Sequence, residues 1–286
     1  MTIPPAYAHR LHNWFLDLQN RICTVLEALE IESNGLDIYN PYTQEKFTER
    51  NWDFKQDGGG KMRILQNGRT FEKAGVNVSC VSGEFSEDFA HHIPGAEEDP
   101  KFWACGLSLV IHPRNPFVPI IHMNTRHIVT KRSWFGGGID LTPCIPQAED
   151  TEYFHQTLQA CCDKFNRNYY PKFKTWCDEY FYLPHRSETR GVGGIFYDYL
   201  NSDNFEADHA FNQNVGESFL TSYPEIVRRN MKKPWSEEEI AKQMHKRGRY
   251  VEFNLIYDRG TQFGLKTGGN TEAILMSLPP TAKWAA

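Results

Sequence analysis

The chemically densest part of the sequence is residues 172–198, KFKTWCDEYFYLPHRSETRGVGGIFYD. Apolar side chains at positions i, i+3, i+4 and i+7 of its first half predict one face of a helix, which Pro184 ends. The loop that follows is cationic, with His185, Arg186 and Arg190, and three glycines lead it into a short apolar run. Glycines this close together indicate backbone that bends sharply or lets another group approach.

A second set of polar residues lies on a predicted β-hairpin. Residues 107–112 and 120–126 alternate between two kinds of side chain, as strands do, and PRNPF between them predicts a turn. If His112 pairs with Val118, one face of the hairpin is polar and cationic. Such a face is either the water-facing side of a sheet or the wall of a binding site, and the hairpin alone leaves both open. The face carries Ser108, His112, His122, Asn124 and Arg126.

Two aspartates are candidate acceptor groups. Asp140 follows three consecutive glycines, 136–138, which predict a corner in the chain rather than a phosphate site, because a carboxylate repels phosphate. Asp258 precedes Arg259 at the end of residues 251–258, whose side chains alternate as in a β-strand. Taken alone, Asp258 and Arg259 are typical of a hairpin turn that faces water.

These segments together resemble the oxygen-dependent coproporphyrinogen III oxidases. The pattern KxWCDxYFxxxHRxExRGxGGIFxD within residues 172–198 is similar to a signature of that family. Further blocks follow in the family's order, so the resemblance covers nearly the whole chain. These blocks are residues 60–79, 106–126, 134–143 and 248–269.

The resemblance implies an enzyme of haem biosynthesis. Its expected reaction is the oxidative decarboxylation of two propionates of coproporphyrinogen III to vinyl groups, which gives protoporphyrinogen IX. Molecular oxygen is the expected co-substrate, with carbon dioxide and peroxide released, and no organic cofactor is expected. The glycine clusters agree, since none has the spacing of a dinucleotide-binding fingerprint.

A flat tetrapyrrole with four carboxylates needs guanidinium or backbone N–H donors, an acceptor for its pyrrole N–H groups, and apolar walls. The resemblance implies catalytic roles for His122, as proton donor, and for Asp140 and Asp258, one of which stabilises or accepts the pyrrole proton. Arg249 is a further candidate partner for carboxylates. The expected substrate-binding residues are Ser108, Asn124, Arg126, Arg259, Gly268 and Gly269.

A divalent metal is an alternative expectation. The resemblance implies a metal role for four histidines in bacterial relatives, although their spacing is a weak metal motif and eukaryotic-type relatives work without metal. We therefore do not expect a metal to be required. Two rival functions stay open, a non-haem metal oxygenase that uses these histidines and a non-catalytic tetrapyrrole carrier. The four are His112, His122, His155 and His185.

Bulk composition excludes other classes. The 286 residues carry a formal net charge of -5, with a pI near 6.1, which does not suit a protein that neutralises nucleic-acid phosphates. No apolar run is long enough for an integral membrane segment, and residues 1–14 lack signal or transit character, so we expect a cytoplasmic protein. The seven cysteines include no CxxC pair, and we expect reduced, mostly packed thiols.

The elements that must position these residues predict an α+β fold. Helical spacing marks residues 11–29, 150–165 and 206–230, and a capping box at Ser236 and Glu239 starts a further helix to about residue 245. We expect one domain over residues 1–286, with a large antiparallel sheet flanked by helices on both faces. The resemblance implies the same architecture and a homodimer whose contact includes C-terminal strands. Those predicted strands and the following segments are 251–258, 261–265, the KTGGN loop at 266–270 and an apolar run at 273–278.

Overall fold

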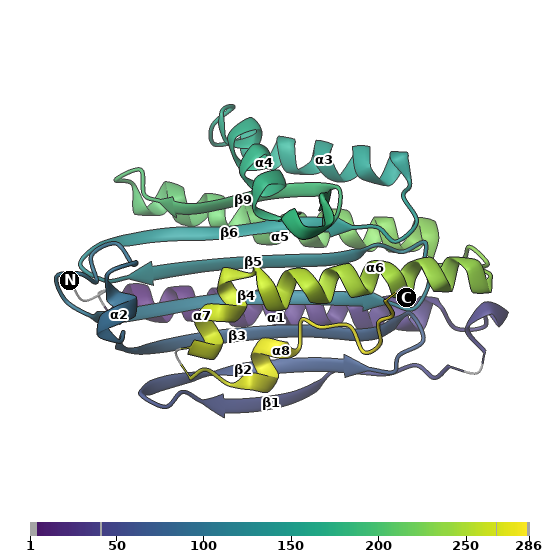
Figure 1. Cartoon of the computed structure of the whole chain (residues 1–286), viewed down its shortest axis with the longest axis horizontal. Coiled ribbons are helices and arrows are strands. Elements are labelled where there is room, and N and C mark those ends of the chain that lie inside the picture. Colours follow the sequence, from purple (N-terminus) through teal and green to yellow (C-terminus); the bar gives the residue numbers. More distant parts are fainter. Residues whose placement is uncertain (1–4, 41, 267, 285–286) are drawn as a thin grey trace.

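A seven-stranded antiparallel sheet is the centre of the computed structural model, which describes residues 5–40, 42–266 and 268–284 (Figure 1). The strand order is β1-β2-β3-β4-β5-β6-β9, so six strands follow the chain and the last joins from further along the sequence. The predicted α+β class and large antiparallel sheet are confirmed. The strands are β1 (Thr48–Asp53), β2 (Asp57–Gln66), β3 (Phe71–Glu84), β4 (Lys101–Pro113), β5 (Ile120–Val129), β6 (Ser133–Thr142) and β9 (Gly193–Leu200).

Helices cover both faces of this sheet, as expected. The long helices α1 and α5 lie behind it in Figure 1, α6, α7 and α8 lie in front, and α3 and α4 pack beside the β9 edge. None of the described helices is long and apolar enough to cross a membrane. The helices are α1 (Pro5–Glu32), α2 (Glu87–Ala90), α3 (Ala148–Asp163), α4 (Tyr169–Tyr180), α5 (Phe205–Asn230), α6 (Glu237–Ile256), α7 (Arg259–Lys266) and α8 (Thr271–Leu275). Short elements complete the chain: η1 (Asp37–Tyr39), β7 (Tyr182–Leu183), η2 (Pro184–Arg186) and β8 (Glu188–Thr189).

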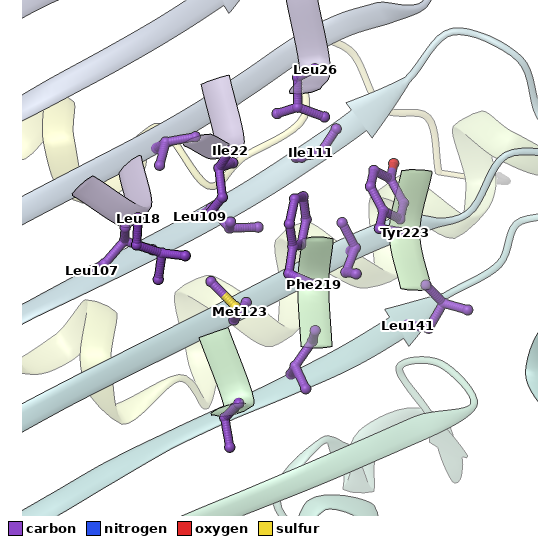
Figure 2. Close-up of a cluster of buried hydrophobic side chains, with 14 of the residues drawn as sticks. Leu18, Ile22, Leu26, Leu107, Leu109, Ile111, Met123, Leu141, Phe219 and Tyr223 are labelled. Carbon is purple, nitrogen blue, oxygen red and sulfur yellow. The ribbon is translucent and has the colours of Figure 1, made fainter. Parts of the chain in front are cut away.

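The main core lies between the sheet and the helices α1 and α5. Alternate residues of β4 point to this side, where they meet side chains from successive turns of α1 and α5 (Figure 2). Burial of each large aliphatic side chain contributes about 1.5–3 kcal/mol, so this layer is the principal source of stability. Its members include Leu18, Ile22, Leu26, Leu107, Leu109, Ile111, Met123, Phe219 and Tyr223.

The β4–β5 hairpin has its predicted polar face, although its register differs from the expectation. Ser108 pairs with Asn124, a shift of two residues from the register that pairs His112 with Val118. The turn is wider than assumed, because Asn115 bonds the following backbone within it. A shift by two leaves every side chain on its original face, so the polar set stays together.

The C-terminal third is helical where the sequence pattern predicted strands. Residues 251–258 are mostly the last turns of α6, residues 261–265 lie in α7, and the apolar run at 273–278 begins in α8. The alternation was misleading because burial follows helical spacing, with Tyr250 and Phe253 buried while Leu255 is 48% exposed. The predicted capping box at the start of α6 is confirmed.

The helical C-terminal third also changes the expected dimer contact. C-terminal strands are not available for the expected dimer contact among the described residues, and a homodimer itself stays a prediction. Within the predicted 266–270 loop, Thr267 lies outside the described residues.

The three glycines at 136–138 do not turn a corner, because they lie inside β6, where all three pair with β5 and Gly137 and Gly138 also pair with β9. The local space explains the residue type. A Cβ atom on Gly137 would come within 2.7 Å of the Asn124 carbonyl oxygen and 2.8 Å of the Tyr197 hydroxyl. Glycine is therefore required by close packing in the middle of the sheet.

Candidate active site

The sheet face beneath α6–α8 carries the predicted polar residues in adjacent cross-strand rows. Each row takes one residue from β4, one from β5 and one from β6. Arg126 lies between two glycines, and a Cβ on Gly136 would come within 2.9 Å of its guanidinium carbon. The glycines therefore let Arg126 lie against the strands. The rows are Gly106–Arg126–Gly136, Ser108–Asn124–Gly138 and Val110–His122–Asp140.

His122 and Asp140 form the central contact of this face. The His122 Nδ1 atom is 2.8 Å from Asp140 Oδ1, and its Nε2 atom is 3.3 Å from the side-chain amide nitrogen of Asn124. Because a carboxylate only accepts, Nδ1 carries the proton and Nε2 is left as the reactive nitrogen. The His122 side chain is 18% exposed, whereas Asp140 is 2% exposed. A ligand on this face therefore meets His122 before it meets Asp140.

Arg190 completes a buried charge cluster, by which we mean His122, Asp140 and Arg190. Its Nη2 atom donates to both carboxylate oxygens of Asp140, at 2.9 and 2.7 Å, and its Nη1 atom donates to Asn254 at 3.0 Å. The guanidinium carbon lies 4.0 Å from the ring centre of Phe181. These contacts pair two of the three guanidinium nitrogens of an arginine whose side chain is only 2% exposed, while its buried Nε atom has no hydrogen-bond partner among the described residues.

Asp140 and Arg190 form an ion pair because the attraction between their opposite charges outweighs the cost of burying them. Burial alone raises the pKa of Asp140, but the charge of Arg190 and the contact with His122 bring that pKa below its ordinary value. Burial likewise lowers the pKa of Arg190, while the Asp140 charge raises it above the ordinary value. Asp140 is thus held as a carboxylate that fixes the orientation of His122.

Arg126 is fixed by a second set of contacts on the same face. Its Nη1 atom donates to Asn124 and its Nη2 atom donates to Asp198, both at 2.8 Å. Asp198 also accepts a hydrogen bond from the Trp134 indole nitrogen at 3.1 Å. The Arg126 side chain remains 27% exposed. Since an arginine has five N–H donors, donors remain for an incoming carboxylate.

Asp258 and Arg259 lie at the start of α7 rather than in a hairpin turn. The Asp258 carboxylate accepts from the Thr261 amide at 3.0 Å, the Thr261 hydroxyl at 2.7 Å and the Tyr180 hydroxyl at 2.9 Å. Burial opposes ionisation, but the bonds from Thr261 and the charge of His122 lower the pKa of Asp258. Arg259 is exposed, with its guanidinium carbon 5.0 Å from the Tyr180 ring centre.

Other predicted binding residues lie in different surroundings. Gly268 and Gly269 follow α7, where the first approaches the Lys55 side chain and the second bonds the Gly264 carbonyl at 2.9 Å. Arg249 forms ion pairs with Glu188 and Glu252, both at 3.0 Å. The contacts of these residues are separate from the buried charge cluster. Ser108 shares the polar face, as predicted, but lies opposite Asn124 rather than opposite His122, its partner in the expected register.

The four histidines proposed as metal ligands do not gather into one site. His112 bonds the Ser277 carbonyl at 2.8 Å, His155 bonds the Val192 carbonyl at 3.0 Å, and His185 bonds Glu252 at 2.7 Å. The described residues contain no group of three or more His, Cys, Asp or Glu side chains arranged to hold a metal. The residues therefore do not fit a shared metal site.

Sequence comparison places this geometry in a known family. A sequence model of coproporphyrinogen III oxidase matches residues 10–286. The chain belongs to the coproporphyrinogen III oxidase family. It is 54% identical over 273 residues to the oxygen-dependent coproporphyrinogen-III oxidase of Rickettsia bellii strain RML369-C, covering 96% of each chain. The enzymes of the same printed name from Rickettsia akari strain Hartford and Rickettsia rickettsii strain Sheila Smith are 54% and 53% identical over 272 residues, each covering 95% of this chain and 96% of the relative.

Sequence reasoning missed two residues of this candidate site, Arg190 and Asn254. Arg190 stood in the cationic loop but received no role, and the RGxGG block directly before β9 was the available signal. Asn254 was hidden by the incorrect strand prediction for residues 251–258. Both lie far along the chain from Asp140, so only the fold brings them together.

Proposed function

We propose that this protein is an oxygen-dependent coproporphyrinogen III oxidase that converts two propionates of coproporphyrinogen III to vinyl groups, giving protoporphyrinogen IX. The observation that carries the proposal is the buried charge cluster on the same sheet face as Arg126, in a chain that belongs to this family. Each conversion takes one propionate, one O2 and one proton to one vinyl group, one CO2 and one H2O2. The site must therefore bind carboxylates and supply a proton.

Carboxylate binding is assigned to Arg126 and Arg259, both of which solvent reaches. Arg126 is held in place by Asn124 and Asp198 but keeps unused donors, and Arg259 is exposed at the start of α7. Bidentate arginine contacts suit propionates because the planar guanidinium matches the carboxylate geometry. Ser108 and Asn124 add neutral donors on the same face. Gly268 and Gly269, near the end of α7, keep their predicted place among the substrate-binding residues, and their amides bond the Leu265 and Gly264 carbonyls within the chain.

Proton transfer is assigned to His122. Asp140 holds the Nδ1 proton, so the Nε2 atom can take up a proton and donate it on the exposed side. The Asp140 carboxylate stabilises the protonated ring, and Arg190 keeps that carboxylate ionised and oriented. Asp140 is therefore a positioning residue in this proposal rather than a direct acceptor for a pyrrole N–H group.

Asp258 is assigned an electrostatic and positioning role. Its carboxylate oxygens are occupied by hydrogen bonds from Thr261 and Tyr180, and it fixes the start of the helix on which Arg259 lies. Its negative charge also interacts with His122. We propose that it stabilises the cationic pyrrole that forms as oxygen withdraws electrons from the substrate.

The proposal includes no organic cofactor and no required metal, and it includes a cytoplasmic homodimer. The support is chemical for the first part: the electron-rich porphyrinogen can itself reduce oxygen. Sedimentation tests the dimer. Turnover by a chelator-treated preparation that contains no metal tests the rival non-haem metal oxygenase, which would be inactive under those conditions.

Aerobic and anaerobic incubations with coproporphyrinogen III provide the main test. The expected result is vinyl product and carbon dioxide in the aerobic sample, with oxygen uptake in proportion to product. No product under oxygen, or equal product without it, contradicts the proposal. Binding of the porphyrinogen without oxygen uptake supports the rival carrier function.

A further inference from the structure

Two cysteines face each other across the strands β3 and β4, on the side of the sheet that packs against α1 and α5. Cys80 pairs directly with Cys105, and the register runs without a shift from this pair to Glu84 and Lys101 at the strand ends. One step beyond that end, the Phe85 amide donates to the Pro100 carbonyl at 2.9 Å. That bond shows which residue pairs between β3 and β4 are hydrogen-bonded and which are not.

This alternation makes Cys80 and Cys105 a non-hydrogen-bonded pair. Antiparallel pairs alternate between bonded and non-bonded, and the cysteine pair lies an odd number of steps from the bonded Phe85–Pro100 pair. In non-bonded pairs the Cα atoms are about 4.5 Å apart and the side chains are closer than in bonded pairs. This separation falls within the range of about 4.4–6.8 Å that a disulfide spans.

The two sulfurs differ in their access to solvent. Cys105 is 1% exposed, whereas Cys80 is half-buried, because its neighbour on β2 is Gly59, which has no side chain. The next residues on this face, Ser82 and Trp103, line a cavity of about 760 Å³. A small oxidant can therefore approach Cys80 first, with Cys105 directly behind it.

The two sulfurs also differ in acidity. A hydrogen bond from the Cys105 thiol lowers the pKa of Cys80, against the opposing effect of burial, and the Trp103 indole adds to the lowering. Burial raises the pKa of Cys105 well above its usual value. The remaining cysteines, all within the described part of the chain, have raised pKa values because of burial. Cys80 is thus the most readily ionised thiol of the seven.

We propose that Cys80 and Cys105 are a site of reversible oxidation, at which hydrogen peroxide produces a cross-strand disulfide. The Cys80 thiolate attacks peroxide, which forms an S–O bond, breaks the O–O bond and releases hydroxide. The Cys105 thiol then attacks the sulfenic acid, which forms the S–S bond and releases water. In total, two thiols and one H2O2 give one disulfide and two H2O, and the two electrons pass from sulfur to peroxide.

Peptide mapping of the intact protein after treatment with stoichiometric peroxide tests this proposal. We expect a linked peptide pair containing Cys80 and Cys105, the loss of two free thiols per chain, and full recovery with dithiothreitol. Cys105→Ser should stop at a sulfenic acid on Cys80 that dimedone traps, and Cys80→Ser should form no disulfide. Porphyrinogen turnover of Cys80→Ser should equal that of the wild type before oxidation, because this face is opposite His122.

Cys144→Ser is the matched control. Cys144 is also half-buried, but burial raises its pKa to about 11, so its removal should leave disulfide formation unchanged. A map that lacks the Cys80–Cys105 link, or oxidation of Cys80→Ser at the wild-type rate, overturns the proposal. The wild-type map decides the question even if a serine variant does not fold.

Discussion

Arg190 donates through a single nitrogen, Nη2, to both carboxylate oxygens of Asp140, and each side chain is only 2% exposed. The ion pair is therefore shielded from substrate and solvent, while its third member, His122, is accessible. The pair also joins the loop before β9 to β6, two segments that are 50 residues apart. A structural contact that joins β6 to the loop before β9 thus also holds the carboxylate that orients His122.

Arg190→Met should destabilise the protein strongly. The substitution leaves the buried Asp140 carboxylate without its cation, and removal of one partner of a buried ion pair costs about 3–5 kcal/mol. Urea unfolding measures this loss. Arg186→Met is the control, because Arg186 is 39% exposed and its partner Glu252 keeps bonds from Arg249 and Trp284, so the substitution should cost about 0–1 kcal/mol. Similar losses for the two variants would mean that the Asp140 contact adds little.

His122→Gln should lose turnover while the fold is kept. Removal of a general acid lowers kcat by about 10²–10⁴-fold, and glutamine replaces the partly buried ring with a polar side chain of similar length. Steady-state assays with coproporphyrinogen III and thermal melts separate the two effects. His245→Gln is a control on α6, where a half-buried histidine contacts Arg249. Normal turnover in His122→Gln would remove this residue from the mechanism.

Gly136→Ala should weaken substrate binding. The added Cβ would lie 2.9 Å from the Arg126 guanidinium carbon and 2.6 Å from an Asp198 carboxylate oxygen, so the ion pair must move. We expect KM to rise about tenfold, equivalent to about 1.4 kcal/mol, with a smaller change in kcat. Arg126→Lys should give a similar pattern, because lysine lacks the planar fork. An unchanged KM in both variants would argue against carboxylate binding by Arg126.

Acid should destabilise the protein through two buried histidines. Burial lowers the pKa of His127 and of His209 to about 4. A nearby positive charge lowers each pKa further: that of His209 acts on His127, and that of Arg10 acts on His209. Unfolded histidine titrates near pH 6.5, so between about pH 6.5 and 4 the unfolded state binds more protons. Stability therefore falls as the pH falls through this window, by up to about 3 kcal/mol for each histidine.

His127→Phe tests this pH dependence. His127 already packs against the rings of Phe135 and Phe205, so an aromatic side chain suits the site. The free energy of unfolding, measured with urea from pH 7 to pH 4.5, should fall less steeply with pH in the variant. The difference in slope should correspond to about one fewer proton taken up on unfolding. Parallel curves for variant and wild type would show that His127 does not contribute.

The polar sheet face could be predicted from sequence because strand periodicity is robust. The pairing of Ser108 with Asn124 was displaced by two residues from the expected register, yet the same side chains share a face. Helices with strong apolar spacing, such as α1, were equally accessible. The local sequence pattern was sufficient to predict the structure wherever the burial of side chains depends on one helix or one hairpin.

Prediction failed where distant contacts decide the structure. Residues 251–258 alternate as a strand does, but the helix buries Tyr250 and Phe253 around Arg190, a partner far away in sequence. The pairing of β6 with β9 likewise joins segments separated by two helices, and it supplies part of the crowding that requires the glycine run at 136–138. The Arg190–Asp140 contact depends on this pairing and has no local signature.

The order of the elements along the chain has a consequence for biosynthesis. The sheet and the helices behind it are encoded before α6, so a nascent chain can assemble its hydrophobic layer while the reactive face is still bare. Asn254 and Ser277, which bond Arg190 and His112, are translated after that layer. A ribosome-bound intermediate that stops before them would thus carry an unshielded arginine and histidine, and competence for catalysis would arrive only once α6 and α8 have been made.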